Sequence, residues 1–445
     1  MTGQPPPAQD PRAFGFETRQ LHAGQRPDPN TGARAVPVFQ TTSYVFEDPE
    51  SAAAYFNLQE YGNTYSRIMN PTVAVFEERV ANLEGGAGAV AFASGIAAQA
   101  AALFTLLVPG DHVVSSAALY GGTVNQLKHL LGKMNVRLTW VDPDDLDAWR
   151  DAVRPETKAF YAETIGNPGG NVLDLAAVAA IAHEHELPLI VDNTFATPYL
   201  CRPIEWGADI VVHSATKFIG GHGTSIGGAV VEAGTFDWSN GRFPVVADPS
   251  PAYHGLRFHE TFGMYGYLMK LRAETLRDLG AALSPFNAFL FLQGLETLSL
   301  RMERHVTNAL AIATFLEEHE LAARVTYPGL PGSRYAPLVA KYLPRGAGAV
   351  FSFDCAGGRA GGQGLIGGLT LWSHLANVGD AKSLVIHPAS TTHRQLGDAE
   401  LAAAGVGPGT IRLSVGTESV DDLIWDLERG FARVAAVLDG KVATA

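Results

Sequence analysis

The sequence is poor in cysteine. Its 445 residues include only Cys201 and Cys355, which lie far apart and outside any Cys-x-x-Cys pair. A disulfide scaffold and a zinc ribbon both need more cysteines at closer spacing, so neither is expected. Two unpaired cysteines are typical of a reducing compartment, and we predict a cytoplasmic protein.

An excess of positive charge is also missing. The chain has 32 Lys and Arg residues against 45 Asp and Glu residues, a formal net charge of −13, and no run of basic residues. A surface that binds nucleic acid needs such a basic patch, so no nucleic-acid partner is expected. Any phosphate group must therefore bind to a locally built site.

Long apolar runs are scarce. The exception, residues 89–109, has no charged residue and is long enough to cross a bilayer. It is rich in alanine rather than leucine and contains Ser94, Gly95 and Gln99. We therefore predict a strand followed by a buried helix, and no membrane association. The start of the chain lacks the apolar core of a signal peptide and is predicted to be a disordered leader.

Two common site motifs are incomplete. The glycine-rich pieces at residues 85–88 and 221–223 do not complete Gly-x-Gly-x-x-Gly, which argues against a nicotinamide dehydrogenase. His183 and His185 do not have the spacing of His-Glu-x-x-His. This stretch is predicted to be a solvated helix end, and no metal site is expected.

What the sequence does contain is an alternation of short apolar strands and helical patterns. Strands are predicted near residues 111–115, 136–141, 158–163, 189–194 and 210–212, and a helix over 72–84. This alternation is typical of an α/β fold with a mostly parallel sheet. We predict an N-terminal arm over 1–71, a central domain over 72–284, and a smaller α+β domain over 285–445 that begins where Pro285 interrupts a helical pattern.

The most informative stretch runs from Ala208 to Gly223. The apolar strand at 210–212 is followed by His-Ser-Ala-Thr-Lys, in which Ser214 and Thr216 offer hydroxyl groups beside Lys217. Upstream, another strand ends in a single carboxylate, Asp192. Open α/β sheets bind ligands at the carboxyl ends of their strands. A lysine and an aspartate there are the two groups that pyridoxal phosphate needs, although Lys217 alone would be read as a surface lysine.

Other positions have both a functional and a structural interpretation. Tyr65 and Arg67 are predicted to lie on an extended stretch and therefore to point the same way, where they could bind a phosphate or form a surface pair. Gly95 begins a helix whose free amides could bind an anion, or it marks a plain tight turn. Tyr120 could stack on a flat ring or simply pack. Arg412, inside an apolar strand, needs an anion, which a ligand or a structural salt bridge could supply.

Two long motifs give a resemblance to a known family. With Val-Asp-Asn-Thr-Phe-Ala-Thr-Pro at 191–198 and His-Ser-Ala-Thr-Lys at 213–217, the chain resembles the Cys/Met-metabolism family of pyridoxal-phosphate enzymes. That family includes cystathionine γ-synthase and O-acetylhomoserine sulfhydrylase. The resemblance implies a fold type I aminotransferase-like architecture, a seven-stranded, mostly parallel sheet in the cofactor domain, and pyridoxal 5'-phosphate as cofactor.

The resemblance also implies a role for each motif residue. Lys217 would bind the cofactor covalently and move protons, and Tyr120 would stack on it and help to protonate the leaving group. The other implied cofactor ligands are Asp192, Gly95, Ile96, Asn167, Ser214, Thr216, Tyr65 and Arg67, and the implied substrate ligands are Arg412 and Asn377. In the family, the motif with Tyr65 and Arg67 reaches the neighbouring subunit's phosphate. The resemblance therefore implies at least an obligate dimer with shared active sites, and we expect a homotetramer built as a dimer of dimers, with the dimer left open.

One further motif points to a member of the family. Asn-Val-Gly-Asp-Ala-Lys-Ser-Leu at 377–384 resembles the sulfhydrylase version, whereas cystathionine γ-synthases and lyases usually have Ser-Leu-Gly-Gly-x-Glu-Ser. The resemblance implies that O-acetyl-L-homoserine and sulfide give L-homocysteine and acetate, in methionine biosynthesis, with O-acetylserine as a second substrate to consider. Cystathionine γ-synthase, O-succinylhomoserine sulfhydrylase and methionine γ-lyase stay open as alternatives. The insertion at 232–266 could be a lid or a subunit contact.

Overall fold

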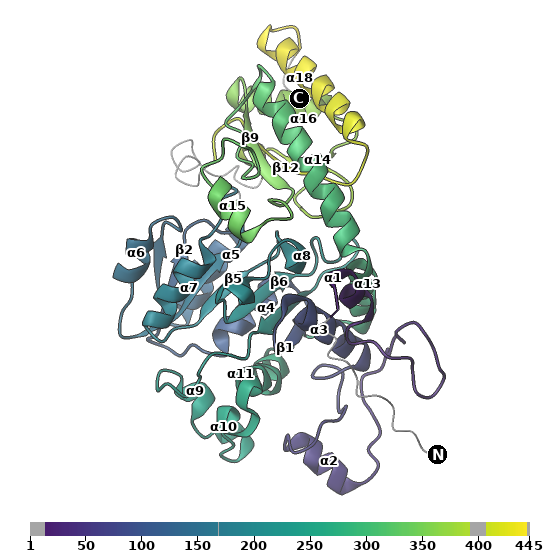
Figure 1. Ribbon diagram of the computed structural model, residues 1–445, viewed down its shortest axis with the longest axis vertical. Coiled ribbons are helices and arrows are strands. Elements are labelled where there is room, and N and C mark those ends of the chain that lie inside the picture. Colours follow the sequence, from purple (N-terminus) through teal and green to yellow (C-terminus); the bar gives the residue numbers. More distant parts are fainter. Residues whose placement is uncertain (1–13, 168, 392–405, 443–445) are drawn as a thin grey trace.

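The computed structural model describes residues 14–167, 169–391 and 406–442. The predicted leader, up to residue 13, lies outside these ranges. Figure 1 shows an elongated molecule with a large sheet and its helices in the lower part and the C-terminal elements at the top. Helix α2 (Pro49–Phe56) projects at the lower right, apart from the other helices.

The lower part is built on a seven-stranded sheet of order β1-β7-β6-β5-β4-β2-β3. Neighbouring strands pair in parallel except at β7, which runs antiparallel to both β1 and β6. The strands are β1 (Gly88–Phe92), β2 (His112–Ser116), β3 (Arg137–Val141), β4 (Thr157–Glu163), β5 (Leu189–Asp192), β6 (Ile210–Ser214) and β7 (Gly228–Glu232). The predicted, mostly parallel sheet is confirmed. Strand β7 is not among the predicted strands, because its apolar run directly follows Gly227 and Gly228 and glycine weakens a strand pattern.

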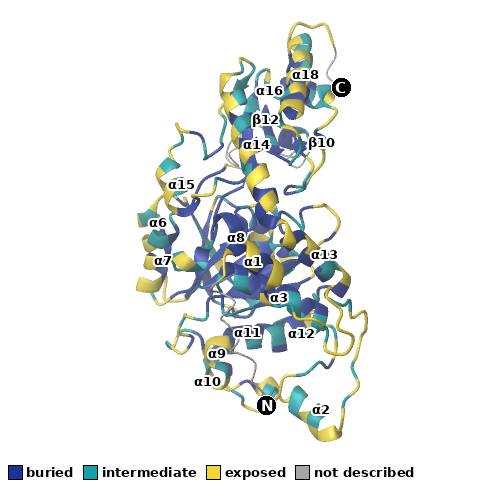
Figure 2. Ribbon diagram, turned by 45° about the vertical axis from the view of Figure 1, so that its right-hand side comes forward, coloured by how far each residue is buried: buried dark blue, intermediate teal, exposed yellow. Residues whose placement is uncertain are grey.

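Alternate residues of each strand face two separate cores. On β4, Phe160 and Ala162 belong to the core on the side of α3 and α7, whereas Ala159 and Tyr161 belong to the core on the side of α4. Helices therefore cover both faces of the sheet, which is why its strands read as continuous apolar runs. Figure 2 shows this middle layer as mainly buried.

The helices around this sheet follow the predicted alternation. The predicted helix over 72–84 is confirmed as α3, which Asn70 caps by accepting the Thr72 N–H at 3.0 Å. The helices of this part are α1 (Phe16–His22), α2, α3 (Pro71–Glu84), α4 (Gly95–Phe104), α5 (Gly121–Asn125), α6 (Leu146–Asp151), α7 (Leu175–Glu184), α8 (Thr197–Leu200), α9 (Pro244–Ala247), α10 (Phe258–Phe262), α11 (Gly266–Lys270), α12 (Arg277–Leu279) and α13 (Pro285–Glu296).

The uncharged stretch at 89–109 forms β1 and then the buried helix α4, as predicted. The Ser94 hydroxyl group caps α4 by accepting the Ala97 N–H at 3.1 Å. Over the described ranges, no helix combines the length and the apolar character needed to cross a membrane.

The upper part has a smaller sheet of order β10-β11-β12-β9-β8, in which only the β10–β11 pair is parallel. Its elements are α14 (Leu298–Glu318), β8 (Ala322–Ala323), α15 (Ala336–Tyr342), β9 (Val350–Cys355), α16 (Gly358–Gly368), β10 (Ser373–His374), β11 (Leu384–Ile386), β12 (Thr410–Ser414) and α18 (Val420–Leu438). The predicted α+β class of this part is confirmed. Helix α14 contacts both α8 below and α18 above, and the exact domain boundary stays a prediction.

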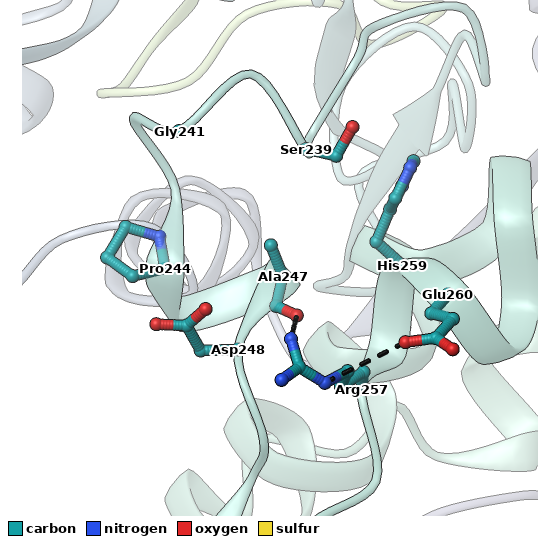
Figure 3. Close-up of a pocket in the computed structure, with 8 residues that line it drawn as sticks. All are labelled: Ser239, Gly241, Pro244, Ala247, Asp248, Arg257, His259 and Glu260. Carbon is teal, nitrogen blue, oxygen red and sulfur yellow. Dashed lines mark hydrogen bonds and ion pairs between the residues drawn. The ribbon is translucent and has the colours of Figure 1, made fainter.

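The segment after β7 packs at the amino-terminal edge of the large sheet. The Lys158 side chain donates to the Arg242 carbonyl oxygen at 2.6 Å beside the start of β4, and the Asn240 amide donates to the Glu186 carbonyl oxygen at 3.1 Å. Residues of α9, α10 and the preceding loop enclose a hollow of about 370 Å³, shown in Figure 3. This edge is opposite to the predicted cofactor ligands, which argues against a lid. The subunit-contact interpretation stays a prediction.

Candidate active site

Lys217 lies in the turn that directly follows β6. Its amine donates a hydrogen bond to Asn377 Oδ1, in the loop between β10 and β11, so this contact joins the two parts of the molecule. The pKa of Lys217 is lowered to about 8, first by burial and second by the positive charge of Arg412. A lysine with this pKa has a usable neutral fraction near neutral pH, as a nucleophile and general base needs.

Asp192 ends β5, one strand away from Lys217. It pairs with Glu163 of β4 and Val212 of β6 in the register of the sheet. Its Oδ1 atom accepts the Thr194 N–H at 2.9 Å. Burial raises the pKa of Asp192 above its usual value, although the hydrogen bonds from Thr194 oppose this. A cationic ring nitrogen beside this carboxyl group would favour its ionised form.

A buried polar network lies behind these strand ends. His213 Nε2 and Asn193 Nδ2 both contact Glu84 Oε1, at 2.6 and 2.8 Å, and the Thr164 hydroxyl group donates to Asn193 Oδ1 at 2.8 Å. All of these side chains are buried. Because they come from α3, β6 and the ends of β4 and β5, the network fixes the relative positions of the segments that end at Asp192 and Lys217.

The start of α4 lies directly against the end of β6. A Cβ atom on Gly95 would lie 2.6 Å from Ser214 Cβ, so only glycine allows this approach. Ile96, which is 38% exposed, follows in the first turn, where the helix leaves N–H groups without helical acceptors. Ser214 donates its N–H to Thr194 Oγ1 at 2.8 Å, and the Thr216 hydroxyl group contacts the Gly227 carbonyl oxygen at 3.2 Å. Free amides and hydroxyl groups in this arrangement suit a phosphate.

Arg412 lies on β12 and faces the same region from the upper sheet. Its Nη1 atom donates to Asn167 Oδ1 at 3.4 Å. Burial lowers the pKa of Arg412, and the nearby Tyr120 partly offsets this. In the part of the chain that the structure covers, Arg412 forms no ion pair with a carboxylate. The salt-bridge interpretation is therefore not supported, and the guanidinium group is available to an anionic ligand.

Glu163 is a site residue that the sequence analysis missed. Its Oε1 atom accepts the Tyr120 N–H at 2.7 Å, and the Asn167 backbone gives it a second hydrogen bond. The Tyr120 residue is 49% exposed, so its ring is open to a ligand. Burial, together with the charge of Asp192, raises the pKa of Glu163. The signal was present, because Glu163 ends a predicted strand as Asp192 does.

The loop at 377–383 packs closely on the turn that contains Lys217. Gly379 has a φ of +77°, and a Cβ atom there would lie 2.7 Å from the Phe218 nitrogen. The Ala381 N–H donates to the Gly221 carbonyl oxygen at 2.8 Å. The position of Asn377 therefore depends on backbone contact between two segments that are far apart in the sequence.

Tyr65 and Arg67 are the predicted ligands that the chain does not bring to this cluster. Arg67 donates to the Arg277 carbonyl oxygen, and its guanidinium group lies 5.5 Å from the centre of the Tyr65 ring. Both side chains belong to the arm that includes α2. The expected extended stretch was wrong, because residues 66–68 form a turn in which the Ile68 and Met69 N–H groups donate to the Tyr65 carbonyl oxygen at 2.9 and 3.1 Å. No hydrogen bond or ion pair within the described ranges links either residue to Lys217, Asp192 or Ser214. Their role in a neighbouring subunit's site stays a prediction.

Comparisons with known proteins agree with this geometry. Residues 17–432 match the Cys/Met metabolism PLP-dependent enzyme family. The chain is 51% identical to O-acetyl-L-homoserine sulfhydrylase of Leptospira meyeri, over 95% of this chain and 98% of the relative, and 52% identical to homocysteine synthase of Schizosaccharomyces pombe, over 92% and 96%. A crystal structure assigned as an O-acetylhomoserine (thiol)-lyase from Campylobacter jejuni, which contains N'-pyridoxyl-lysine-5'-monophosphate, has a TM-score of 0.91 and 41% identity, over 94% of this chain and all of that chain. The expected fold type I architecture is confirmed, and the chain belongs to the Cys/Met metabolism PLP-dependent enzyme family.

Proposed function

We propose that this protein is a γ-replacement enzyme that converts O-acetyl-L-homoserine and sulfide to L-homocysteine and acetate. The observation that supports it most is the Lys217 amine at the carboxyl end of β6, which has a pKa of about 8, donates a hydrogen bond to Asn377 and interacts with the charge of Arg412 from the smaller sheet. The names of the relatives at about 50% identity support the same substrates. Relatives named homocysteine/cysteine synthase, at 48% and 47% identity, support activity on O-acetylserine as a second substrate.

The residues of this site fit pyridoxal phosphate. Lys217 would hold it covalently, Asp192 would pair with its ring nitrogen and Tyr120 would stack on its ring. The phosphate ligands of this chain would be Gly95, Ile96, Ser214 and Thr216, and Asn167 would bind a ring substituent. When bound, the cofactor withdraws electrons from the substrate so that the Cα proton becomes acidic. Two observations support this fit: the close approach of Gly95 to Ser214, and the Arg412 guanidinium group, which bonds to Asn167 but has no carboxylate partner among the described residues.

The protein side chains then divide the work on the substrate. Arg412 would bind the α-carboxylate, and Asn377 would orient both the substrate and the Lys217 amine. The substrate's amine would take the place of Lys217, and the freed Lys217 amine, whose pKa is low, can then accept the proton from Cα and move a proton at Cβ. Tyr120 is close enough to Arg412 for the two side chains to interact electrostatically, and it would donate a proton to the leaving acetate group. The Cγ–O bond breaks as acetate departs, and the sulfur of hydrosulfide forms the new bond to Cγ.

We also propose the assembly, the domains and the location. The exposed arm with Tyr65 and Arg67 supports a homotetramer, a dimer of dimers in which these residues complete the partner's phosphate site. The arm would span 1–71, the cofactor domain 72–284 and the substrate domain 285–445. Cys201 and Cys355 are free and buried, which supports a cytoplasmic location.

The test is product analysis by mass spectrometry with purified protein, pyridoxal phosphate and O-acetyl-L-homoserine. One sample receives sulfide, a second receives cysteine and a third receives neither. We expect homocysteine in the first sample, with its formation abolished in Lys217→Ala. Cystathionine as the main product of the second sample would indicate a cystathionine γ-synthase, and 2-oxobutanoate in all three would indicate a lyase. Replacing the substrate by O-succinyl-L-homoserine tests the remaining alternative.

A further inference from the structure

Helix α14 presents three buried polar side chains on one face. Arg301, His305 and Asn308 are spaced by four and three residues, which places them above one another on the same side of the helix. They are 8%, 0% and 2% exposed, whereas Arg304, between them in sequence, is exposed. A helix face with this composition is unusual in a core and calls for partners.

Arg301 binds the turn that contains the proposed catalytic lysine. Its Nη1 atom donates to the carbonyl oxygen of Phe218 at 2.7 Å, and its Nη2 atom donates to that of Ile219 at 3.3 Å and to that of Gly294 at 2.6 Å. Phe218 and Ile219 directly follow Lys217. A Cβ atom on Gly221 would lie 2.1 Å from Nη1, so the backbone of this turn fits closely around the guanidinium group.

The other two side chains bind the chain just beyond Arg412. His305 donates from Nδ1 to the Val415 carbonyl oxygen at 2.6 Å, and its ring packs edge-on against Phe218 at 5.2 Å. Asn308 Nδ2 donates to the carbonyl oxygens of Gly416 and Glu418, at 3.0 and 2.9 Å. The same helix face therefore contacts both the lysine turn and the end of β12.

The third segment of the site is attached through Glu418. Its carboxylate accepts the N–H of Ser383 at 2.7 Å and the hydroxyl group of Ser383 at 2.9 Å, and the Gly416 N–H donates to that hydroxyl oxygen at 2.8 Å. Ser383 ends the loop that begins at Asn377. Lys217, Asn377 and Arg412 are thus each followed, within a few residues, by backbone that is fixed directly or indirectly to α14.

The charge of Arg301 distinguishes this arrangement from ordinary packing. Among the residues that the structure describes, Arg301 forms no ion pair with a carboxylate, and burial lowers its pKa to about 10. An apolar side chain would fill the same volume without the cost of burying a charge. A guanidinium group that binds carbonyl oxygens instead fixes backbone positions, because its donors have a rigid planar geometry.

We propose that Arg301, supported by His305 and Asn308, is a positioning residue that holds the Lys217 turn in register with the Asn377 loop and the Arg412 strand. The inference rests on the proposed function only for the roles of Lys217 and Arg412. It assigns to α14 the task of keeping the proton-transferring amine at the correct distance from a substrate whose carboxylate is held by the other part of the molecule.

The first test compares Arg301→Met with Arg304→Met by hydrogen exchange and mass spectrometry, using cofactor-free protein. Loss of the guanidinium donors should speed exchange of residues 218–221 and 379–383 about tenfold, because the Ala381 N–H is bonded to Gly221, while Arg304→Met exchanges like the native chain. Unchanged exchange in both segments would overturn the proposal. This measurement needs no substrate, so it stands whether or not the product is homocysteine.

The second test separates positioning from folding. Per cofactor-loaded site, Arg301→Met should lower kcat about a hundredfold and change KM for the amino-acid substrate by less than about threefold, since the lysine moves and Arg412 does not. Arg301→Lys, which keeps the charge and one donor direction, should recover part of kcat. If Arg301→Met does not fold, Asn308→Ala tests the same proposal. In this variant we expect faster hydrogen exchange at residues 383 and 416–418 and a raised KM for the amino-acid substrate. Native kcat and KM in the folded variants would overturn the proposal.

Discussion

The contact between Gly379 and the Lys217 turn allows a quantitative prediction for Gly379→Ala. The new Cβ atom would lie 2.7 Å from the Phe218 nitrogen and 3.1 Å from Lys217 Cα. Both are backbone atoms, so no side-chain rotation can relieve the overlap. One of the two segments has to move.

The size of the movement follows from these distances. Ordinary contact begins at 3.4 Å, so the segments must separate by about 0.7 Å. A displacement approaching 1 Å at a reacting group can cost about a hundredfold in rate, and we expect kcat/KM to fall by about ten- to a hundredfold. The left-handed backbone adds about 1–2 kcal/mol, and overpacking adds about 1–3 kcal/mol. The free energy of unfolding should therefore fall by about 2–5 kcal/mol.

Gly241→Ala is the matched control. Gly241 has a φ of +86°, but a Cβ atom there would meet nothing within 4 Å. The free energy of unfolding of Gly241→Ala should fall only by the cost of the left-handed backbone, about 1–2 kcal/mol, and kcat/KM should be unchanged. Steady-state kinetics and denaturant unfolding of both variants provide the comparison. If Gly379→Ala lost stability but kept native kcat/KM, the link between this contact and the Lys217 amine would be wrong.

Two further predictions concern charge and assembly. In cofactor-free Arg412→Met, the pKa of Lys217 should rise from about 8 toward its ordinary value of 10.5 without reaching it, because the positive neighbour is removed while burial, the larger cause, remains. The rate at which an acylating reagent modifies Lys217, followed against pH by peptide mapping, should shift to higher pH, and a shift to lower pH would contradict the assignment. Mixing inactive Lys217→Ala with inactive Arg67→Ala should restore about a quarter of the sites after subunit exchange, if each site takes Arg67 from the partner. Native mass spectrometry with an affinity tag on one variant confirms the exchange, and no recovery after confirmed exchange would place Arg67 in its own subunit's site.

The sequence predicted the half of the site that depends on the large sheet. Asp192 and Ser214 end strands with clear apolar runs and Lys217 follows one of them, and parallel strands bring their carboxyl ends to one edge. Gly95 was predictable for the same reason, because the strand before it ends at that edge. Local patterns are enough when a regular element determines where its own end lies.

The other half depends on contacts between distant segments, which no local pattern reports. Asn377 reaches Lys217 only because Gly379 fits against the lysine turn, and Arg301, more than eighty residues after Phe218, determines the path of that turn. A buried arginine in a helical pattern looks like an interruption of the apolar face until its carbonyl partners are known. The strand ends therefore contain the residues on which the proposed chemistry depends, whereas the contacts that fix the Lys217 turn and the end of β12 come from helix α14, whose sequence pattern does not indicate them.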